Sequence, residues 1–209
     1  MSDLGRRVQP GDAVAVDGKA VVRNESHTYL LYYKPRGLMC SRKDDQGRPL
    51  IYDKLDVGPA VQSVGRLDME SEGLLILTDD GALTRLLTNP ANGVERVYRV
   101  RLTGEISLDT LERLRRGGID MGEGDFSDPW QITVDAETGG HSWITVTIRR
   151  GRWREVRRTL AACGHMVRRL IRVQFGGLEL DEEMPAGAWR RLTKAEVRQL
   201  QRAATLPNP

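Results

Sequence analysis

The sequence predicts an α+β fold built on a mostly antiparallel sheet. Short segments alternate apolar and polar residues at the period of a strand, and others between them repeat apolar residues at helical spacing. Glycine, proline and aspartate turn signals separate the two kinds of segment. Short strands that interleave with three or four short helices are typical of this class. The 209 residues suffice for one domain with a full core and a short appendage.

The first element is a small hairpin. Residues 8–22 alternate apolar and polar side chains around two turn signals, Pro10-Gly11-Asp12 and Asp17-Gly18. The polar stretch 24–27 is expected to link this hairpin to the main body. The sequence therefore predicts a hairpin followed by a larger domain.

Six further segments are predicted as strands. The segment 28–33 is rich in aromatic residues and leucine and ends at Lys34-Pro35-Arg36-Gly37. In the segment 94–102, Tyr98 shares one face with Val100 and Leu102. The predicted strands are, in chain order, 28–33, 64–67, 73–78, 94–102, 143–149 and 167–173.

Four segments are predicted as helices because leucine and valine recur at helical spacing or a capping motif opens them. Their ends are marked by glycine or by Asn89-Pro90, and Thr193 with Glu196 forms a capping box. The predicted helices are 83–87, 108–114, 154–163 and 193–200.

Composition excludes several classes of protein. Hydrophobic residues make up 39% and charged residues 29%, as in globular proteins rather than disordered ones. No run of 18 apolar residues predicts a membrane span, and no secretory signal is visible. Cys40 and Cys163 are far apart in sequence and are expected to be free thiols. A cytoplasmic location is therefore expected.

Positive charge is concentrated in one segment. Residues 149–172 carry +8, so the rest of the chain, whose total is +3, carries −5. Every basic residue of the segment is arginine, which binds phosphates and stacks on bases. A solvated basic face would also explain the segment, but a surface for nucleic acid is the favoured interpretation. The arginines are 149, 150, 152, 154, 157, 158, 168, 169 and 172.

Most common kinds of chemistry lack their motif. The histidines, His27, His141 and His165, are scattered and predict no metal site, and His165 beside Gly164 is typical of a helix end. No pair of acids is distinguishable as a glycosidase pair. No nucleophile elbow and no glycine-rich phosphate loop occurs.

One carboxylate remains as a candidate nucleophile. Asp68 follows the predicted strand 64–67 and precedes a polar turn before the apolar run 74–77. In such a turn a carboxylate can project into a cleft, but a turn-capping aspartate has the same spacing. Spacing alone leaves both roles open.

Four blocks of sequence resemble the bacterial ribosomal-RNA pseudouridine synthases of the RsuA/RluB group. They follow that family's order and cover most of residues 28–200. The motif GRWREVRR looks closest to that of the large-subunit branch. The blocks are LLYYKPRGLMCSRKDDQGRP (30–49), VGRLDMESEGLLILTDDG (64–81), LLTNPANGVERVYRV (86–100) and GRWREVRRTLAACGHMVRRLIRVQFGGLELDEEMPAGAWRRL (151–192).

The resemblance implies a bifurcated antiparallel sheet with an RNA cleft across its middle, and conversion of one uridine to pseudouridine without a cofactor. Residues 1–23 resemble the closing hairpin of the family's N-terminal alpha-L RNA-binding domain, without its helices, and 24–209 the catalytic domain. Ribosomal RNA is the expected partner, with the large subunit ahead of the small subunit and transfer RNA. A monomer is the default expectation.

The resemblance also assigns catalytic roles. Asp68 is expected to attack either the ribose anomeric carbon or the uracil ring of an everted nucleotide. Arg157 is the expected cation beside it, with Arg158 as the fallback because adjacent helix positions face different ways. Tyr98 is expected to stack on the uracil, although a core tyrosine would share its pattern.

The remaining expected site residues contact RNA or support the site. Arg66 is the candidate to fill the stack that the uridine leaves, and Leu170 is expected to pack beneath the site. The other expected RNA contacts are Lys34, Arg149, Arg150, Arg152, Arg154, Arg158, Arg168 and Arg169. Two rival hypotheses are a non-catalytic RNA-binding ribosome assembly factor and a protein–protein scaffold, neither of which needs Asp68.

Overall fold

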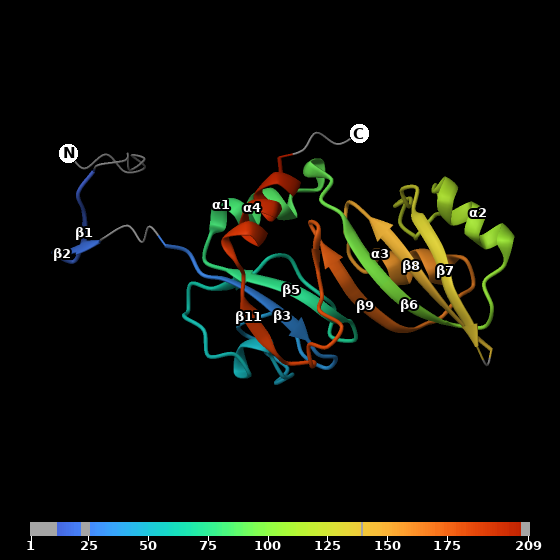
Figure 1. Ribbon diagram of the computed structural model, residues 1–209, viewed down its shortest axis with the longest axis horizontal. Helices are drawn as coiled ribbons and strands as arrows, with labels where there is room; N and C mark the ends of the chain where they lie inside the picture. Colours follow the sequence, from blue (N-terminus) through green and yellow to red (C-terminus); the bar gives the residue numbers. More distant parts are fainter. Residues whose placement is uncertain (1–11, 22–25, 139, 206–209) are drawn as a thin grey trace.

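The computed structural model describes residues 12–21, 26–138 and 140–205, and they form two sheets. The smaller is a hairpin of β1 (Val14–Val16) and β2 (Lys19–Val21). Its turn places Asp17 and Gly18 at φ values of 50° and 74°, as a tight hairpin turn requires. The predicted hairpin is confirmed within these bounds, while its residues 8–11 and 22, and residues 24 and 25 of the predicted linker, lie outside the described residues (Figure 1).

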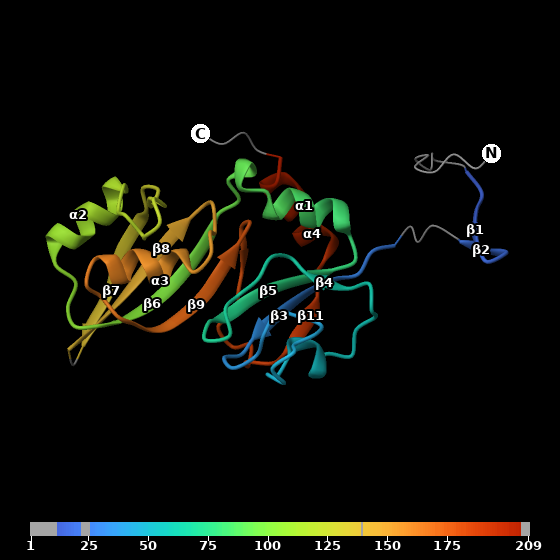
Figure 2. The same cartoon turned by 180° about the vertical axis from the view of Figure 1, so that it is seen from behind.

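The larger sheet has nine strands and forms the body of the molecule (Figures 1 and 2). Their order is β11-β3-β5-β9-β6-β8-β7, with β10 beside β9 and β4 beside β5. Every pair is antiparallel except β5 with β9, so the predicted α+β class with a mostly antiparallel sheet is confirmed. The strands are β3 (Tyr29–Lys34), β4 (Gln62–Ser63), β5 (Glu72–Thr78), β6 (Arg96–Thr103), β7 (Gln131–Thr138), β8 (His141–Ile148), β9 (Val167–Phe175), β10 (Leu178–Glu179) and β11 (Trp189–Arg191).

The two halves of this sheet meet along a very short line. The parallel pairing of β5 with β9 includes only Glu72 with Ile171 and Gly73 with Arg172, and beyond it the strands diverge (Figure 2). Gly73 has a φ of 110°, and a Cβ atom there would lie 2.3 Å from the carbonyl oxygen of Arg172. Only glycine permits this approach of the two backbones, so the sequence fixes where the sheet divides.

Four helices of the described residues lie against the larger sheet, and a side chain caps the first turn of three of them, including the predicted capping box. The third helix has no side-chain cap at its N-cap residue. Asp80 accepts from the Leu83 amide, and Thr193 and Glu196 form the capping box. The helices are α1 (Gly81–Thr88), α2 (Leu108–Arg116), α3 (Glu155–Ala162) and α4 (Lys194–Ala203), with 3₁₀ turns at Ile51–Asp53 and Pro90–Asn92.

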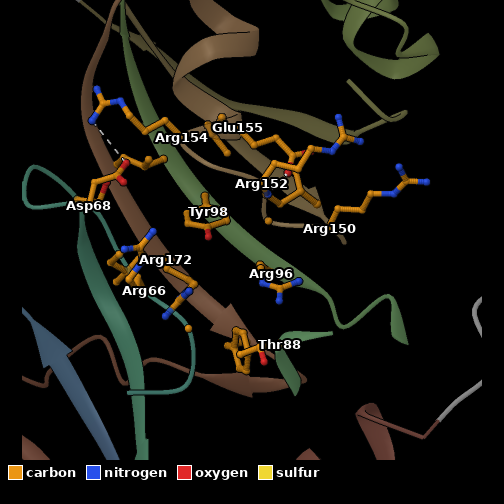
Figure 3. A pocket seen from close by; sticks show the side chains of 18 of the residues that line it. Arg66, Asp68, Thr88, Arg96, Tyr98, Arg150, Arg152, Arg154, Glu155 and Arg172 are labelled. Atoms are coloured by element: carbon orange, nitrogen blue, oxygen red, sulfur yellow. Dashed lines mark hydrogen bonds and ion pairs between the residues drawn. The ribbon is translucent and has the colours of Figure 1, made fainter. Parts of the chain in front are cut away.

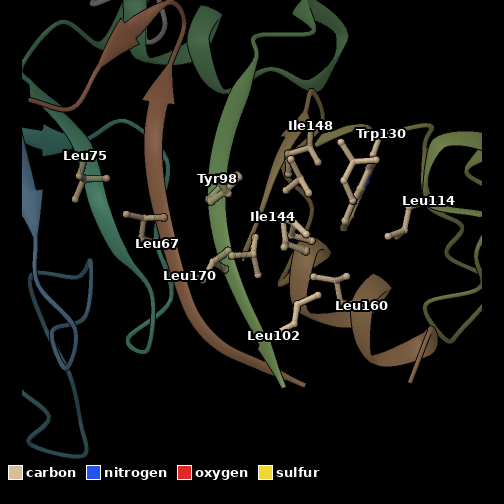
Figure 4. Close-up of a cluster of buried hydrophobic side chains, with 14 of the residues drawn as sticks. Leu67, Leu75, Tyr98, Leu102, Leu114, Trp130, Ile144, Ile148, Leu160 and Leu170 are labelled. Carbon is tan, nitrogen blue, oxygen red and sulfur yellow. The ribbon is translucent and has the colours of Figure 1, made fainter. Parts of the chain in front are cut away.

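The larger hydrophobic core contains the strand faces that alternation predicts (Figure 4). Val100 and Leu102 of β6 are fully buried, and Tyr98 is nearly so. Leu160 of α3 packs in the same core. The predicted leucine stripe of α2 is only partly buried, because its first residue, Leu108, remains 78% exposed.

The strand predictions need correction in two respects. The predicted strand 64–67 is wrong: β4 ends at Ser63, and only the Val64 amide still bonds to the sheet, through the Ile76 carbonyl. The strands β7, β10 and β11 were not predicted. They are edge or very short strands with mostly exposed side chains, so no buried face marks them in the sequence.

Candidate active site

A pocket of ≈230 Å³ lies among the loop before β5, the strands β6 and β9, and the start of α3 (Figure 3). Asp68 and Glu155 are the carboxylates that line it. The pocket is strongly cationic, because its lining also includes the arginines 66, 96, 150, 152, 154 and 172.

The end of β3 holds the loop that carries Asp68. Lys34, the last residue of β3, donates through Nζ to the carbonyl oxygens of Asp68 at 3.2 Å and Ser71 at 2.8 Å. The Gly37 amide donates to the Met69 carbonyl at 2.7 Å. These bonds fix the backbone on both sides of the Asp68 carboxylate, which itself stays about 29% exposed.

Lys34 is therefore a structural residue, which corrects its expected role as an RNA contact. Its side chain is completely buried, and its third bond goes to the Pro35 carbonyl at 3.0 Å. Three carbonyls use all three donors of an ammonium group. Burial lowers the pKa of Lys34 to about 8, and the nearby Asp68 carboxylate partly opposes this shift.

Cys40 anchors the residue before Asp68. Its sulfur lies 3.4 Å from both the amide nitrogen and the carbonyl oxygen of Leu67. Burial raises the pKa of the Cys40 thiol. With Leu67 itself packed in the core, the backbone leading into Asp68 is fixed from two sides.

Arg154 is the cation at Asp68. Its Nη1 lies 3.7 Å from Asp68 Oδ2, and its Nη2 lies 3.8 Å from Glu70 Oε2. Arg154 is the N-cap of α3, with φ 48° and ψ 30°. This left-handed backbone is costly for any residue other than glycine, and strain of this kind is concentrated at functional sites.

The expected pairing of Arg157 with Asp68 is corrected by this geometry. Arg157 donates instead to the carbonyls of Glu70 and Val167, both at 3.2 Å, and its Nη1 lies 3.9 Å from Glu70 Oε2. Burial lowers the pKa of Arg157, and the Glu70 and Asp68 charges oppose the shift. Arg157 thus supports the loop beyond Asp68 rather than the carboxylate.

The fallback, Arg158, lies further away. It donates to the Met121 carbonyl at 3.0 Å and pairs with Asp125 at 2.9 Å, while its guanidinium lies over the Trp153 ring. It therefore fastens α3 to the segment around residue 121, and no bond joins it to the Asp68 loop.

Tyr98 and Leu170 share one face of the sheet and line the pocket. Tyr98 of β6 is paired with Arg172 of β9, and Val100 with Leu170. Both expected residues are buried, Tyr98 at 7% and Leu170 at 4% exposure. Arg66 is an exposed residue of the pocket lining, on the loop that carries Asp68.

The arginine-rich segment 149–172 does not form one basic surface with all its arginines free to bind nucleic acid. This corrects the expectation drawn from its charge. Acids far away in the sequence neutralise much of it: Arg150 and Arg152 pair with Asp128 at 3.2 and 2.7 Å. Further ion pairs join Arg149 to Glu95, Arg152 to Asp125 and Arg169 to Glu72, while Arg168 donates to the Thr103 hydroxyl and Arg172 is buried.

Sequence reasoning missed Arg96 as a pocket residue, and it placed Arg172 in the basic segment without assigning it to the site. Both guanidinium groups lie over the Phe175 ring, at 5.3 and 5.1 Å from its centroid. Arg96 donates to the carbonyls of Val94 at 2.7 Å and Arg149 at 2.6 Å. The missed signal is the strand period, since each arginine lies two residues from a predicted site residue on the same face.

Other kinds of site are not found in the described part of the chain. No group of three or more His, Cys, Asp or Glu side chains there is placed to hold a metal ion. His27 pairs with Asp79, and His141 lies 3.1 Å from the Leu102 carbonyl. Within residues 12–21, 26–138 and 140–205, no helix has the length and apolar character needed to cross a membrane.

Known proteins with similar sequences share one activity in their names. Residues 28–162 match the protein family described as RNA pseudouridylate synthase. The ribosomal large subunit pseudouridine synthase B of Salmonella typhimurium is 38% identical over 216 residues, covering 99% of this chain and 73% of that protein. The protein of the same name from Haemophilus influenzae is 37% identical, and the aligned part covers 99% of this chain and 60% of that protein.

Solved structures agree with the sequence comparison. The crystal structure of a pseudouridylate synthase matches with a TM-score of 0.76 and 29% identity, over 93% of this chain and 83% of that one. A chain of a Cbf5-Nop10-Gar1 complex matches with a TM-score of 0.54 at 15% identity, over 76% of this chain and 52% of that one. The second match shows a shared fold alone.

Proposed function

This chain belongs to the RNA pseudouridylate synthase family, and we propose that it isomerises a uridine of large-subunit ribosomal RNA with Asp68 as its nucleophile. The observation that carries the proposal is the position of Asp68. Its carboxylate lies in a cationic pocket, 3.7 Å from Arg154, on a loop whose backbone is fixed from β3.

The uridine must first leave its stack, because the stacked duplex hides the bond that is broken. Arg66 belongs to the pocket lining and is exposed, so its guanidinium is free to stack where the uridine was. Tyr98 lies deeper in the pocket and offers an aromatic face to the everted uracil. Arg66 thus assists eversion of the uridine, and Tyr98 binds the everted uracil.

Asp68 then forms a covalent bond to the substrate. In one route its oxygen attacks the anomeric carbon, the bond to uracil N1 breaks, and the electron pair stays on the uracil. After the base rotates, its C5 displaces the carboxylate, which recovers its electron pair, and the C5 proton is lost while N1 gains one. In the other route the carboxylate adds first to C6 of the uracil ring, and the bond from N1 to the ribose breaks. A bond from C5 to the anomeric carbon then forms, and the carboxylate leaves C6 with its electron pair as the C5 proton is lost and N1 gains one. Both routes retain base and ribose, so the net reaction is an isomerisation that needs no cofactor.

The arginines around Asp68 have separate roles in this proposal. Arg154 places a positive charge 3.7 Å from the Asp68 carboxylate and stabilises the carboxylate when the substrate releases it. Arg157 positions the loop through the Glu70 carbonyl and carboxylate. A positioned nucleophile with a nearby cation is the arrangement that covalent catalysis by a carboxylate requires.

The target is inferred from the relatives. The Salmonella and Haemophilus proteins are named for the large ribosomal subunit, and the small subunit and transfer RNA are the alternative substrates. A protein with this target would act in the cytoplasm, as a monomer by default.

Tritium release from RNA labelled at uridine C5 tests the proposal. Large-subunit RNA, small-subunit RNA and transfer RNA are incubated separately with the wild-type chain and with Asp68→Asn. We expect release from large-subunit RNA alone, and none with the variant. Release from another RNA class would reassign the target, and release by Asp68→Asn would overturn the role of Asp68.

A further inference from the structure

Arg172 is a buried cation without a counter-charge. Its side chain lies in a residue that is 2% exposed, and its Nε donates to the Leu74 carbonyl at 2.7 Å. Its Nη2 is buried and has no hydrogen-bond partner. Among the described residues, no carboxylate lies within ion-pair distance of it.

Such an arrangement is unfavourable in the free protein. A buried guanidinium normally has acceptors for its donors and an anion nearby, because burial removes its hydration. Arg96 shows the usual solution in the same pocket, since it donates to three backbone carbonyls. Arg172 has one. The residues around the pocket therefore leave a strong donor available for a ligand.

The position of Arg172 indicates which part of a ligand it meets. It lines the pocket and is paired across the sheet with Tyr98, so both side chains lie on the same face (Figure 3). Leu170 and Phe175 of β9 also line the pocket. A flat ring stacked on Tyr98 would therefore share this face of the sheet with the Arg172 side chain.

We propose, building on the function above, that the unpartnered Nη2 of Arg172 donates a hydrogen bond to a carbonyl oxygen of the everted uracil. A uracil carbonyl fits this donor better than a phosphate does, because the donor is buried and its guanidinium lies over the Phe175 ring. The exposed arginines of the pocket, Arg66 and Arg150, are better placed for the hydrated phosphates.

The proposed bond strengthens as the reaction proceeds. If Asp68 attacks the anomeric carbon, the departing uracil carries a negative charge that resonance places on O2 and O4. If Asp68 adds to the ring, the charge develops on O4. In both routes a fixed guanidinium meets charge that the ground state lacks, which is the condition for catalysis by electrostatic stabilisation.

The symmetry of the ring makes one donor sufficient. Turning uracil about the axis through N3 and C6 exchanges N1 with C5 and also exchanges O2 with O4. A donor that binds one oxygen before the turn therefore binds the other after it. Arg172 can thus hold the base through the rotation that the isomerisation requires.

Thiouridine substrates test the proposal. One RNA is prepared with uridine, 2-thiouridine or 4-thiouridine at the target, and single-turnover rates are measured for the wild-type chain, Arg172→Met and Arg172→Lys. Sulfur accepts hydrogen bonds more weakly than oxygen, so we expect at least one thio substrate to slow the wild type about tenfold. Arg172→Met should lose about 100-fold in rate with uridine, and should lose the discrimination against sulfur.

Controls separate this role from a structural one. Arg99→Met removes an arginine that pairs with Asp135 and lies over the Trp143 ring, outside the pocket, and should keep both the rate and the sulfur discrimination. Arg172→Lys retains the charge and should recover part of the rate. Thermal unfolding of Arg172→Met should be unchanged or shifted upward, because an apolar side chain of similar length replaces an uncompensated buried charge.

The outcomes distinguish this inference from the proposed function. A wild-type chain that does not convert uridine contradicts the proposed function itself. A wild-type chain that converts all three substrates at one rate overturns the role of Arg172, whether or not Arg172→Met folds. An active Arg172→Met that still discriminates against sulfur like the wild type overturns it too.

Discussion

Arg154 Nη1 lies 3.7 Å from Asp68 Oδ2, which makes the residue just before α3 the cation of the candidate nucleophile. Arg157, one turn further along, reaches Glu70 instead. The left-handed backbone of Arg154 lets its side chain point to Asp68 while α3 begins at Glu155. The strained backbone of Arg154 and its ion pair with Asp68 are therefore linked.

Two substitutions at Arg154 should separate charge from strain. Arg154→Ala and Arg154→Gly both remove the cation, so each should lower the rate of pseudouridine formation by about 100-fold. Arg154→Gly should also be more stable than Arg154→Ala by about 1 kcal/mol, because glycine adopts φ 48° without penalty. Rates and denaturant unfolding of the two variants measure this. Equal stability would contradict the strain, and wild-type rates would contradict the role of the cation.

Lys34 should make stability depend on pH. Its pKa in the folded protein is about 8 and its ordinary value is 10.5, so the folded chain binds fewer protons than the unfolded chain between these values. The free energy of unfolding should therefore rise with pH across that interval. Urea unfolding at a series of pH values tests this, with Lys34→Met as the control that should lack the rise.

Activity should change in the opposite direction. A neutral amine has two N–H donors for the three carbonyls that Lys34 now binds, so the loop carrying Asp68 loses a restraint as pH rises above about 8. The wild-type rate should decline there. A decline of the same size and midpoint in Lys34→Met would assign it to another group.

Gly73 should tolerate no side chain. Gly73→Ala brings a Cβ atom to 2.3 Å from the Arg172 carbonyl and places alanine at a φ of 110°, which should cost about 2–4 kcal/mol of stability. Gly81→Ala is the matched control, because nothing lies within 4 Å of its Cβ position at the start of α1. It should be neutral or stabilising by up to about 1 kcal/mol. Unfolding free energies compare the two, and similar values would contradict the close approach of β5 and β9.

Asp128 should limit RNA affinity. It neutralises Arg150 and Arg152 together, and both line the pocket. Asp128→Asn removes the ion pair of Arg150 and one of the two ion pairs of Arg152, which keeps Asp125, so RNA should bind more tightly at low salt. The dependence of log Kd on log salt should steepen by about one phosphate contact. Titrations at several salt concentrations measure both effects, and weaker binding would show that Asp128 serves to position the arginines.

The sequence predicts local features of this fold well. Alternation places Tyr98 on the buried face of β6, and the capping box at Thr193 opens α4. The predicted segment around Asp68 is a loop instead of a strand end, yet the residue still projects into a pocket. Periodicity and capping involve residues close together in the chain, so they can be recognised from one sequence.

Features that depend on distant residues could not be predicted. Lys34 follows the predicted strand 28–33 at a turn, which suggests exposure, but the side chain is buried and binds three carbonyls from two segments. The acid Asp128 lies over 20 residues before the arginines it neutralises. The choice between Arg154 and Arg157 depends on the backbone conformation of a single residue at the start of α3. Composition shows the charges but not their partners.

The most direct test of the central claim compares the wild type with Asp68→Asn on one RNA. Asparagine has nearly the same shape and keeps the backbone bonds to Lys34 and Ser71, so folding and RNA binding should be retained. It cannot act as an ionised nucleophile. Single-turnover tritium release should occur with the wild type and fall by at least about 10⁴-fold with Asp68→Asn, at an unchanged Kd for RNA. Product formation by Asp68→Asn at a rate near that of the wild type would contradict the account.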